Sequence, residues 1–267
     1  MRLNKYISET GVCSRREADK WIEAGRVTCN GAPAALGTQV GAADDVRVDG
    51  ELIGPKRGRI YIALNKPVGV TSTSAHEVDR NVVDLVGHAE RIFPIGRLDK
   101  DSEGLILLTN DGDIVNEILR AENGHEKEYL VTVNRPITDL TLQIIRSGVR
   151  IMGVMTKPCQ ATRLDARTFR LILTQGLNRQ IRRMCSALGY RVERLQRVRI
   201  INIHLGSLGA GEWRILAPAE VAGLMPQNFQ AGRSSAEATP SDQRRPVAAR
   251  QSGSPALPAS QRKKSGP

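Results

Sequence analysis

The sequence predicts an α+β protein with two unequal domains. Its 267 residues are too many for one small module. Strand-like and helix-like segments alternate irregularly, unlike the regular order of a parallel α/β sheet, which favours a mixed, mainly antiparallel sheet flanked by helices. A polar, basic, glycine- and proline-containing segment interrupts these patterns. We therefore predict an N-terminal domain over residues 1–54, a linker over 55–59, a larger domain over 60–225 and a disordered basic tail over 226–267.

The composition narrows the class of protein. Basic residues outnumber acidic ones, 39 to 28, and the net charge of +11 points to nucleic acid or an anionic membrane surface as partner. No apolar run is long enough to cross a bilayer, and the opening residues lack a secretory apolar core. The four cysteines show no zinc-ligand spacing, and aromatic residues are only 3%, which disfavours an RNA surface of stacked rings. We expect a cytoplasmic protein without a membrane segment or a metal.

The positive charge is concentrated in two segments. Residues 226–267 carry 7 basic and 2 acidic residues among many prolines and serines, without hydrophobic periodicity. Such a segment buries too little apolar surface to offset its chain entropy, so we predict that it is disordered. Between Arg179 and Arg199 lie seven arginines and a single acid, Glu193. Because the guanidinium fork suits phosphate contacts, this segment favours a nucleic-acid surface over a merely solvated face.

The first domain is predicted to combine two helices with short strands. Apolar spacing over residues 3–7 predicts the first helix. The second begins at Ser14, which forms an S-x-x-E capping box with Glu17, and it ends at Gly25. Alternating segments after this glycine indicate short strands joined by turns.

Two arginines in the second helix point to an anionic ligand. Arg15 and Arg16 occupy its first turn, where the helix dipole disfavours cations unless a phosphate docks there. The segments RLNKYIS, CSRREAD, VTCNG and VRVDG together resemble the S-four-type RNA-binding domain, named after a ribosomal protein. The resemblance implies that the helix pair faces structured RNA, with Arg2, Lys5, Arg15 and Arg16 as RNA-binding residues. The alternative is a helical cap without RNA contact.

An acidic loop precedes the most apolar strand predicted for the chain. The run Phe93–Gly104 leads into LILLT and then into an amphipathic helix. Acids at alternate positions imitate the start of a calcium-binding loop, but the twelfth position is Asn110 and apolar residues fill the second half, which excludes calcium. A carboxylate pair for glycosidase chemistry stays open, because spacing alone does not place two acids across a sugar. We assign the other acids of this region to turns and helix ends: Asp101, Glu103, Asp111 and Asp113.

Three segments of the larger domain carry a second resemblance. GRLDKDSEGLILLTNDGD, HEKEYLV and GLNRQIRRM resemble the signature of the RsuA/RluB/RluE/RluF family of RNA pseudouridine synthases, and the similarity extends over residues 2–220. It implies that Asp99 is catalytic, that Tyr129 lies against the target base and that Arg182 pairs with the catalytic carboxylate. An ordinary core role for Tyr129 stays open. The resemblance also implies that the reaction needs no cofactor.

The same resemblance implies contacts to RNA and a substrate class. Arg97 would fill the space left by an everted nucleotide or hold that nucleotide, and a plain phosphate contact is the equal alternative. Arg179 and Arg183 would face RNA, because they lie outside the apolar stripe of the helix that they open. The implied substrate is a uridine of 23S ribosomal RNA, with a transfer RNA uridine as a second candidate. We expect a monomer.

The implied reaction is an isomerisation. The bond between the anomeric carbon and a ring nitrogen breaks, the uracil rotates, and it rejoins the sugar through a ring carbon. Asp99 must be ionised, either to attack the anomeric carbon or to remove a proton from the neighbouring sugar carbon, and both routes stay open. A carboxylate in a dry pocket needs a cation to stay charged, and Arg182 is the predicted partner. The nucleotide is expected to be flipped out of the RNA into a cleft across the middle of the sheet.

A second function belongs to another class. The chain could be a noncatalytic RNA-binding or ribosome-assembly factor that keeps the same fold. The complete set of Asp99, Tyr129 and Arg182 argues against this alternative, because a pure binder gains nothing from a carboxylate that faces a phosphate-rich ligand.

Overall fold

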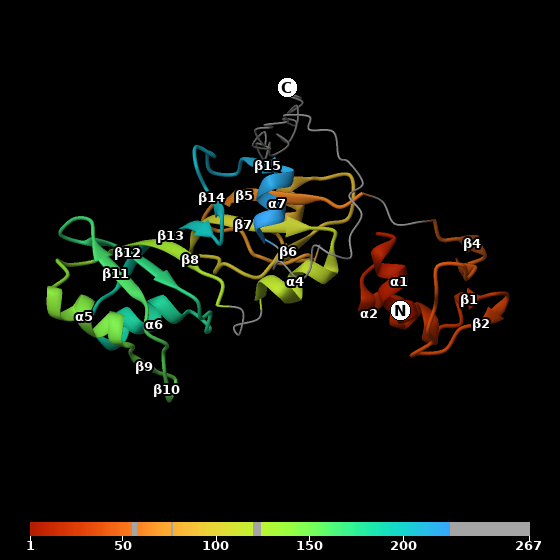
Figure 1. Cartoon of the computed structure of the whole chain (residues 1–267), viewed down its shortest axis with the longest axis horizontal. Helices are drawn as coiled ribbons and strands as arrows, with labels where there is room; N and C mark the ends of the chain where they lie inside the picture. The colour runs from red at the N-terminus through yellow and green to blue at the C-terminus, as the bar shows by residue number, and fades with distance from the viewer. Residues whose placement is uncertain (55–57, 76, 120–123, 225–267) are drawn as a thin grey trace, which may run out of the picture.

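The computed structural model describes residues 1–54, 58–75, 77–119 and 124–224, which form two α+β domains (Figure 1). In the N-terminal domain, two helices share one apolar core with a small antiparallel sheet of strand order β2-β1-β3-β4. Its elements are α1 (Leu3–Glu9), α2 (Arg15–Glu23), β1 (Val27–Cys29), β2 (Ala32–Pro33), β3 (Val46–Val48) and β4 (Glu51–Leu52).

The local signals of the N-terminal domain are confirmed. The Ser14 hydroxyl accepts a hydrogen bond from the Glu17 amide at 3.1 Å, as expected of a helix cap. Gly25 lies two residues after the end of α2 and has a φ of +70°, a left-handed conformation that favours glycine. Leu3 and Ile7 of α1 are buried together with Ile22 of α2, so the two helices pack through the predicted apolar faces.

A nine-stranded sheet organises the larger domain. Its main path is β11-β12-β8-β13-β7-β5-β15, while β14 pairs with β13 and β6 pairs with β7. The pairing of β13 with β7 is parallel and the other described pairings are antiparallel, which confirms the predicted mixed, mainly antiparallel sheet. The strands are β5 (Tyr61–Lys66), β6 (Phe93–Ile95), β7 (Glu103–Thr109), β8 (Lys127–Val133), β11 (Gln160–Arg163), β12 (Thr168–Leu173), β13 (Val192–Ile200), β14 (Ile203–His204) and β15 (Trp213–Ile215), with a separate hairpin of β9 (Arg150–Ile151) and β10 (Val154–Met155).

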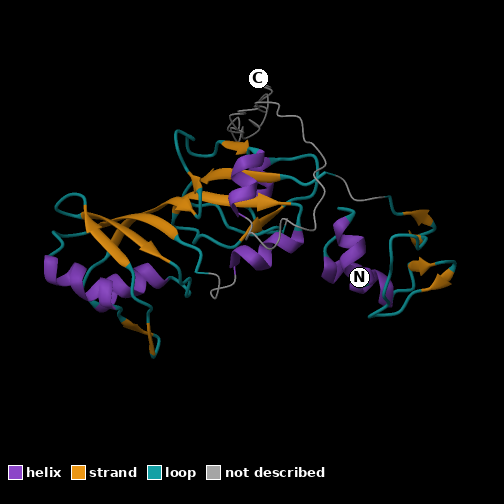
Figure 2. Ribbon diagram, in the orientation of Figure 1, coloured by secondary structure: helices purple, strands orange, loops and turns teal. Residues whose placement is uncertain are grey.

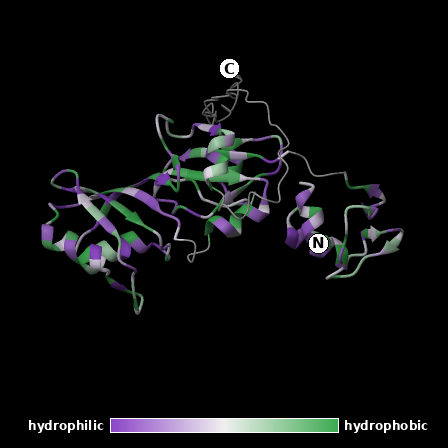
Figure 3. Ribbon diagram, in the orientation of Figure 1, coloured by the Kyte–Doolittle hydropathy of each residue, from purple (hydrophilic) through white to green (hydrophobic). Residues whose placement is uncertain are grey.

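The two halves of this sheet are covered differently (Figure 2). β5 and β7 contribute to apolar clusters on both faces, one with α4 and α7 and the other with α3, which explains the unbroken run LILLT. β8 and β12 alternate between buried and more exposed residues, because α5 and α6 cover one face only. Figure 3 shows the hydrophobic residues gathered along the central strands. The helices are α3 (Val82–Val86), α4 (Gly112–Leu119), α5 (Asp139–Ser147), α6 (Gln180–Ala187) and α7 (Pro218–Leu224).

Strand β13 joins the two halves and has β7 and β8 as its neighbours. At Gly104 of β7 the φ angle is +103°, and a Cβ atom there would overlap the carbonyl oxygen of Arg197 on β13. Only glycine therefore permits this close parallel approach. The loop before β7 and the strand β8 consequently lie near the middle of the sheet, separated by the single strand β13.

Parts of the domain prediction fall beyond the structure. The predicted tail over 226–267 and residues 55–57 of the predicted linker lie outside the described residues. No helix in the described ranges has the length and apolar character that a bilayer crossing requires.

Candidate active site

The candidate site is built on the loop that joins β6 to β7 and carries Asp99. Hydrogen bonds from a neighbouring segment hold this loop on both sides of the aspartate. The Ser72 hydroxyl donates to the Leu98 carbonyl at 2.8 Å and accepts from the Leu98 amide at 3.1 Å. The Gly69 amide donates to the Lys100 carbonyl at 2.7 Å. Because these partners come from buried or backbone groups, the position of Asp99 is set by the fold rather than by the loop alone.

Arg197 of β13 supports the same loop from beneath. Its side chain is buried, its Nε donates to the Leu105 carbonyl at 2.7 Å, and its Nη1 donates to the Arg97 carbonyl at 3.4 Å. This one guanidinium therefore joins the start of the loop that carries Asp99 to the strand that follows it. Arg197 was not predictable as a site residue, because nothing in the arginine-rich segment distinguishes an inward guanidinium from an outward one.

The Asp99 carboxylate is open to solvent and lies beside a guanidinium. Its side chain is 30% exposed, and Arg179 Nη1 lies 3.7 Å from Asp99 Oδ2. Arg179 also donates two hydrogen bonds to the Asp101 carboxylate, at 3.0 and 2.9 Å. Its backbone is left-handed, with a φ of +50°, at the residue that precedes α6. This uncommon conformation for a non-glycine residue accompanies a guanidinium shared between two acids.

The structure brings Arg182 to Asp101 rather than to Asp99, so the predicted pairing of Arg182 with Asp99 stays a prediction. The Arg182 guanidinium forms an ion pair with Asp101, Nε to Oδ2 at 3.4 Å, and donates to the Asp101 carbonyl at 2.8 Å. A further bond joins it to the Ser102 hydroxyl at 3.2 Å, and no ion pair with Asp99 forms. The reason is the position of Arg182 in the first turn of α6, which faces the end of the loop, whereas Arg179 precedes the helix and reaches Asp99.

Asp101 has a larger part in the site than its sequence pattern indicates. It was assigned to a turn, but it binds both Arg179 and Arg182. The hydrogen bonds from Arg179, followed by the charge of Arg182, lower the pKa of Asp101 below its ordinary value. The charge balance of the sequence offered a signal for this role. Two arginines beside Asp99, namely Arg179 and Arg182, need more than one carboxylate to pair with. Asp101 thus anchors the helix that carries both guanidiniums to the loop that carries Asp99.

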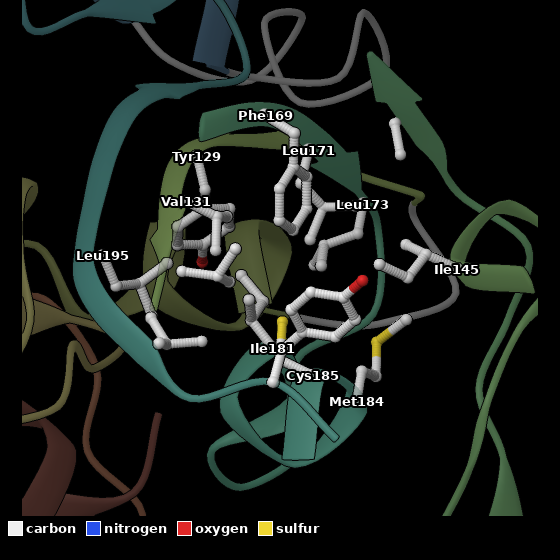
Figure 4. Packing of buried hydrophobic residues seen from close by; sticks show 14 of the residues in the cluster. Tyr129, Val131, Ile145, Phe169, Leu171, Leu173, Ile181, Met184, Cys185 and Leu195 are labelled. Carbon is white, nitrogen blue, oxygen red and sulfur yellow. The ribbon is translucent and has the colours of Figure 1, made fainter. Parts of the chain in front are cut away.

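Tyr129 lies on the other side of β13 from the loop. It sits on β8 opposite Arg197 and is buried in the same apolar cluster as Leu98, the residue before Asp99. Figure 4 shows its ring among Val131, Ile181 and Leu195. Its hydroxyl has no hydrogen-bond partner among the described residues. A ring in this place is part of the core and also borders the loop, so contact with a base stays a prediction.

A buried lysine lies at the end of β5, close to these acids. Lys66 is fully buried, and its Nζ donates to the carbonyl oxygens of Pro67 and Val70, each at 2.9 Å. Burial, and to a lesser degree the charge of Arg197, lowers its pKa to about 8. The sequence analysis placed a turn after this lysine and did not foresee that its charge would be enclosed. Two buried cationic side chains, Lys66 and Arg197, therefore lie beneath the loop that carries Asp99.

The remaining predicted RNA contacts of this region lie on the surface. Arg97 is exposed, and its side chain makes no hydrogen bond or ion pair with a described residue. Arg183 is exposed and donates to the backbone carbonyl and the side-chain oxygen of Asn178, both at 3.0 Å. Together with Arg179, they surround the exposed side of the Asp99 loop and α6. Their binding to RNA stays a prediction.

The predicted RNA-binding residues of the N-terminal domain have different surroundings. Arg2 and Arg16 are exposed. Arg15 lines a cleft between this domain and the larger one. Lys5 forms an ion pair with Asp113 of α4 at 2.7 Å, so its charge joins the two domains instead of being freely available to RNA.

Comparison with known proteins agrees with this arrangement. The sequence pattern of the RNA pseudouridylate synthase family matches residues 60–187, and that of the S4 domain matches residues 1–46. The dual-specificity RNA pseudouridine synthase RluF of Salmonella typhi is 56% identical over 225 residues, which cover 84% of this chain and 78% of that protein. RluF of Escherichia coli K12 is 54% identical over 226 residues, with the same shares covered.

More distant relatives show the same relationship. The ribosomal large subunit pseudouridine synthase B of Bacillus subtilis is 35% identical over 232 residues, covering 84% of this chain and 95% of that protein. A crystal structure of a pseudouridylate synthase superposes with a TM-score of 0.61 at 31% identity, covering 84% of this chain and all of that one. The fold, the matched patterns and these relatives lead to one conclusion: the chain belongs to the RluF-like RNA pseudouridine synthases and carries an N-terminal S4 domain.

Proposed function

We propose that the chain isomerises a uridine of 23S ribosomal RNA to pseudouridine and accepts a transfer RNA uridine as a second substrate. Two relatives support this choice of RNA, one named a dual-specificity RNA pseudouridine synthase and one a ribosomal large subunit pseudouridine synthase. The observation that carries the proposal is the solvent-open Asp99 carboxylate, held on a hydrogen-bonded loop beside Arg179. We further propose that it acts as a cytoplasmic monomer, since one chain supplies every residue of this site.

The reaction balances without any added group. The C1′–N1 bond of the uridine breaks, the uracil turns, and a C1′–C5 bond forms. C5 loses its proton and N1 gains one, so the product is an isomer of the substrate. Asp99 acts as an ionised carboxylate, either attacking C1′ or removing a proton from C2′. Both routes develop charge on the sugar next to Asp99, which is where a fixed carboxylate is most effective.

The arginines around Asp99 have different tasks in this proposal. Arg179 pairs with the Asp99 carboxylate, with Nη1 lying 3.7 Å from Oδ2. Arg182 acts as a positioning residue, because its bonds go to Asp101 and Ser102 at the end of the loop. Asp101 holds both guanidiniums and thereby joins the loop to α6.

The target uridine must leave its helical stack before it reaches Asp99. Arg97 is exposed two residues before Asp99 and is placed to occupy the vacated space or to hold the everted nucleotide. The Tyr129 ring borders the loop through Leu98 and would pack against the uracil near C5. Contacts of the everted nucleotide with the Tyr129 ring and the Arg97 guanidinium would offset the free energy that unstacking costs.

The test maps pseudouridine in ribosomal and transfer RNA from cells with and without the protein. Loss of specific modified sites, and their return with the wild-type chain, is the expected result. Cells that carry Asp99→Ala should not regain these sites, although the purified variant still binds 23S ribosomal RNA. If Asp99→Ala restores the modification, the catalytic assignment is wrong. If no site depends on the protein at all, the noncatalytic RNA-binding alternative takes its place.

A further inference from the structure

A cleft lies where the N-terminal domain meets the larger domain, next to α4. Its volume is about 260 Å³, and it is lined by Ser14 and Arg15 from one domain and by Arg91 and Phe93 from the other. Beside it, the ion pair between Lys5 and Asp113 joins α1 to α4. The cleft is therefore a junction whose two walls come from separately folded units.

Neither guanidinium of this cleft is held by a carboxylate of a described residue through a hydrogen bond or a close ion pair, although the charge of Glu17 acts on Arg91. Neither Arg15 nor Arg91 forms a hydrogen bond or an ion pair with a residue that the structure describes, and Arg91 instead lies over the Phe93 ring at 5.8 Å. Burial lowers the pKa of Arg91, which reflects the cost of a desolvated positive charge. The acid among the described lining residues is Glu9, and Lys5 lies 3.7 Å from its carboxylate. An anion that entered the cleft would interact favourably with both guanidiniums.

Phosphate is the anion that this geometry suits. Guanidinium groups bind phosphate through two parallel N–H donors, and both arginines keep their donors free. The first turn of α2 opens onto the same cleft at Ser14 and Arg15, so the helix dipole adds to the attraction. In a protein whose substrate is RNA, the available phosphates are those of the RNA backbone.

We infer that the interdomain cleft binds a backbone phosphate of the RNA substrate, held jointly by Arg15 and Arg91. This inference rests on the proposed function, because it takes RNA as the ligand. The ion pair between Lys5 and Asp113 joins the domains beside the cleft, and a shared phosphate would add a second link between them. Bound RNA would thereby fix the distance between the S4 domain and Asp99, and the correct uridine would be selected partly by that distance.

The experiment measures binding of an unmodified full-length 23S ribosomal RNA transcript over a range of KCl concentrations. The variants are Arg15→Gln, Arg91→Gln and the double variant. Arg47→Gln is the matched control, because it removes the same charge from the N-terminal domain where the guanidinium is already paired with Asp45. Arg91→Lys keeps the charge and removes the bidentate fork.

Each single variant is expected to bind about fivefold more weakly, and the double variant should lower the salt slope by about one. Because the arginines share one phosphate, the loss in the double variant should be smaller than the product of the single losses. Arg91→Lys should lose affinity and keep the slope. Arg47→Gln should change neither quantity.

Multiplicative losses, or slopes no different from that of Arg47→Gln, would overturn the shared site. Should Arg91→Gln fail to fold, Arg15→Gln alone and combined with Arg91→Lys still measures the coupling. Failure of the proposed function looks different. A wild-type protein that shows the predicted coupling but forms no pseudouridine would contradict the enzymatic proposal and leave the phosphate site standing.

Discussion

The loop around Asp99 and the helix pair of the N-terminal domain use arginine in opposite ways. At the loop, Arg179 and Arg182 are bound to the side chain and backbone of Asp101. In the helix pair, Arg15 and Arg16 make no hydrogen bond or ion pair with described residues. A paired guanidinium holds geometry, whereas an unpaired one keeps its donors for a ligand. The arginines of the first region therefore position the loop that carries Asp99, whereas those of the second region are available to bind a ligand.

The largest difference between the two regions is expected for the substitution Asp99→Asn. The substitution keeps the shape of the side chain and removes its charge, so activity should fall by at least about 10³-fold. RNA affinity should be equal or slightly higher, because a negative charge facing phosphate is lost. Tritium release from RNA labelled at uridine C5 measures the first quantity, and filter binding measures the second. Glu103→Gln, whose carboxylate pairs with Arg194 at 2.5 Å, is the control acid and should remain active.

Lys66 offers a test of charge buried beneath the loop. Its pKa falls from 10.5 to about 8 in the folded chain, so between these values the unfolded chain binds more protons and stability rises with pH. The free energy of unfolding should gain about 3 kcal/mol from pH 7.5 to 10.5 relative to Lys66→Met, at 1.36 kcal/mol per pKa unit.

Fluorescence of Trp213, which lies on β15 opposite Leu64 of β5, would follow this unfolding. A Trp21→Phe background removes the signal of the N-terminal domain. The Lys66→Met comparison cancels the titration of the buried cysteines, which acts in the opposite direction. Parallel pH profiles of the two proteins would show that Lys66 is not enclosed as described.

Asp101→Asn tests whether paired arginines hold the site. Without this carboxylate, Arg179 and Arg182 lose their shared anchor, so kcat should fall about tenfold while RNA affinity changes little. Because the pKa of Asp101 is lowered, its carboxylate stays ionised at a pH equal to the ordinary value of 3.8, so the wild type should not show this loss when it is titrated to that pH. If kcat falls no more than it does in Glu103→Gln, Asp101 only stabilises the turn in which it lies.

The smallest expected effect belongs to Arg16 in the helix pair. Arg16→Gln should weaken RNA binding about threefold and lower the salt slope by slightly less than one, because one phosphate contact releases its counterion. Binding titrations at several KCl concentrations measure both. An unchanged slope would remove Arg16 from the RNA surface, and a large loss of kcat at saturating RNA would erase the distinction between the two regions.

The sequence by itself determined the local structure and the chemical class of the protein. The capping box at Ser14, the stop at Gly25 and the run LILLT before a turn predicted the elements, because these signals act between near neighbours. The GRLD, KEYLV and RQIRR segments indicated the family. These segments also supplied Asp99, Tyr129 and Arg182 as candidates, of which the structure places Asp99 on the open loop beside a guanidinium.

Only the tertiary structure decided which charges meet. It joined Arg182 to Asp101, brought Arg179 to Asp99, enclosed Lys66 and Arg197, and placed Arg15 and Arg91 at one cleft. Ion pairs depend on distances of a few ångströms between residues far apart in the chain, and periodicity carries no information about them. An arginine-rich helix has the same pattern whether a side chain turns inward or outward, so its partners become known only when the sheet places them.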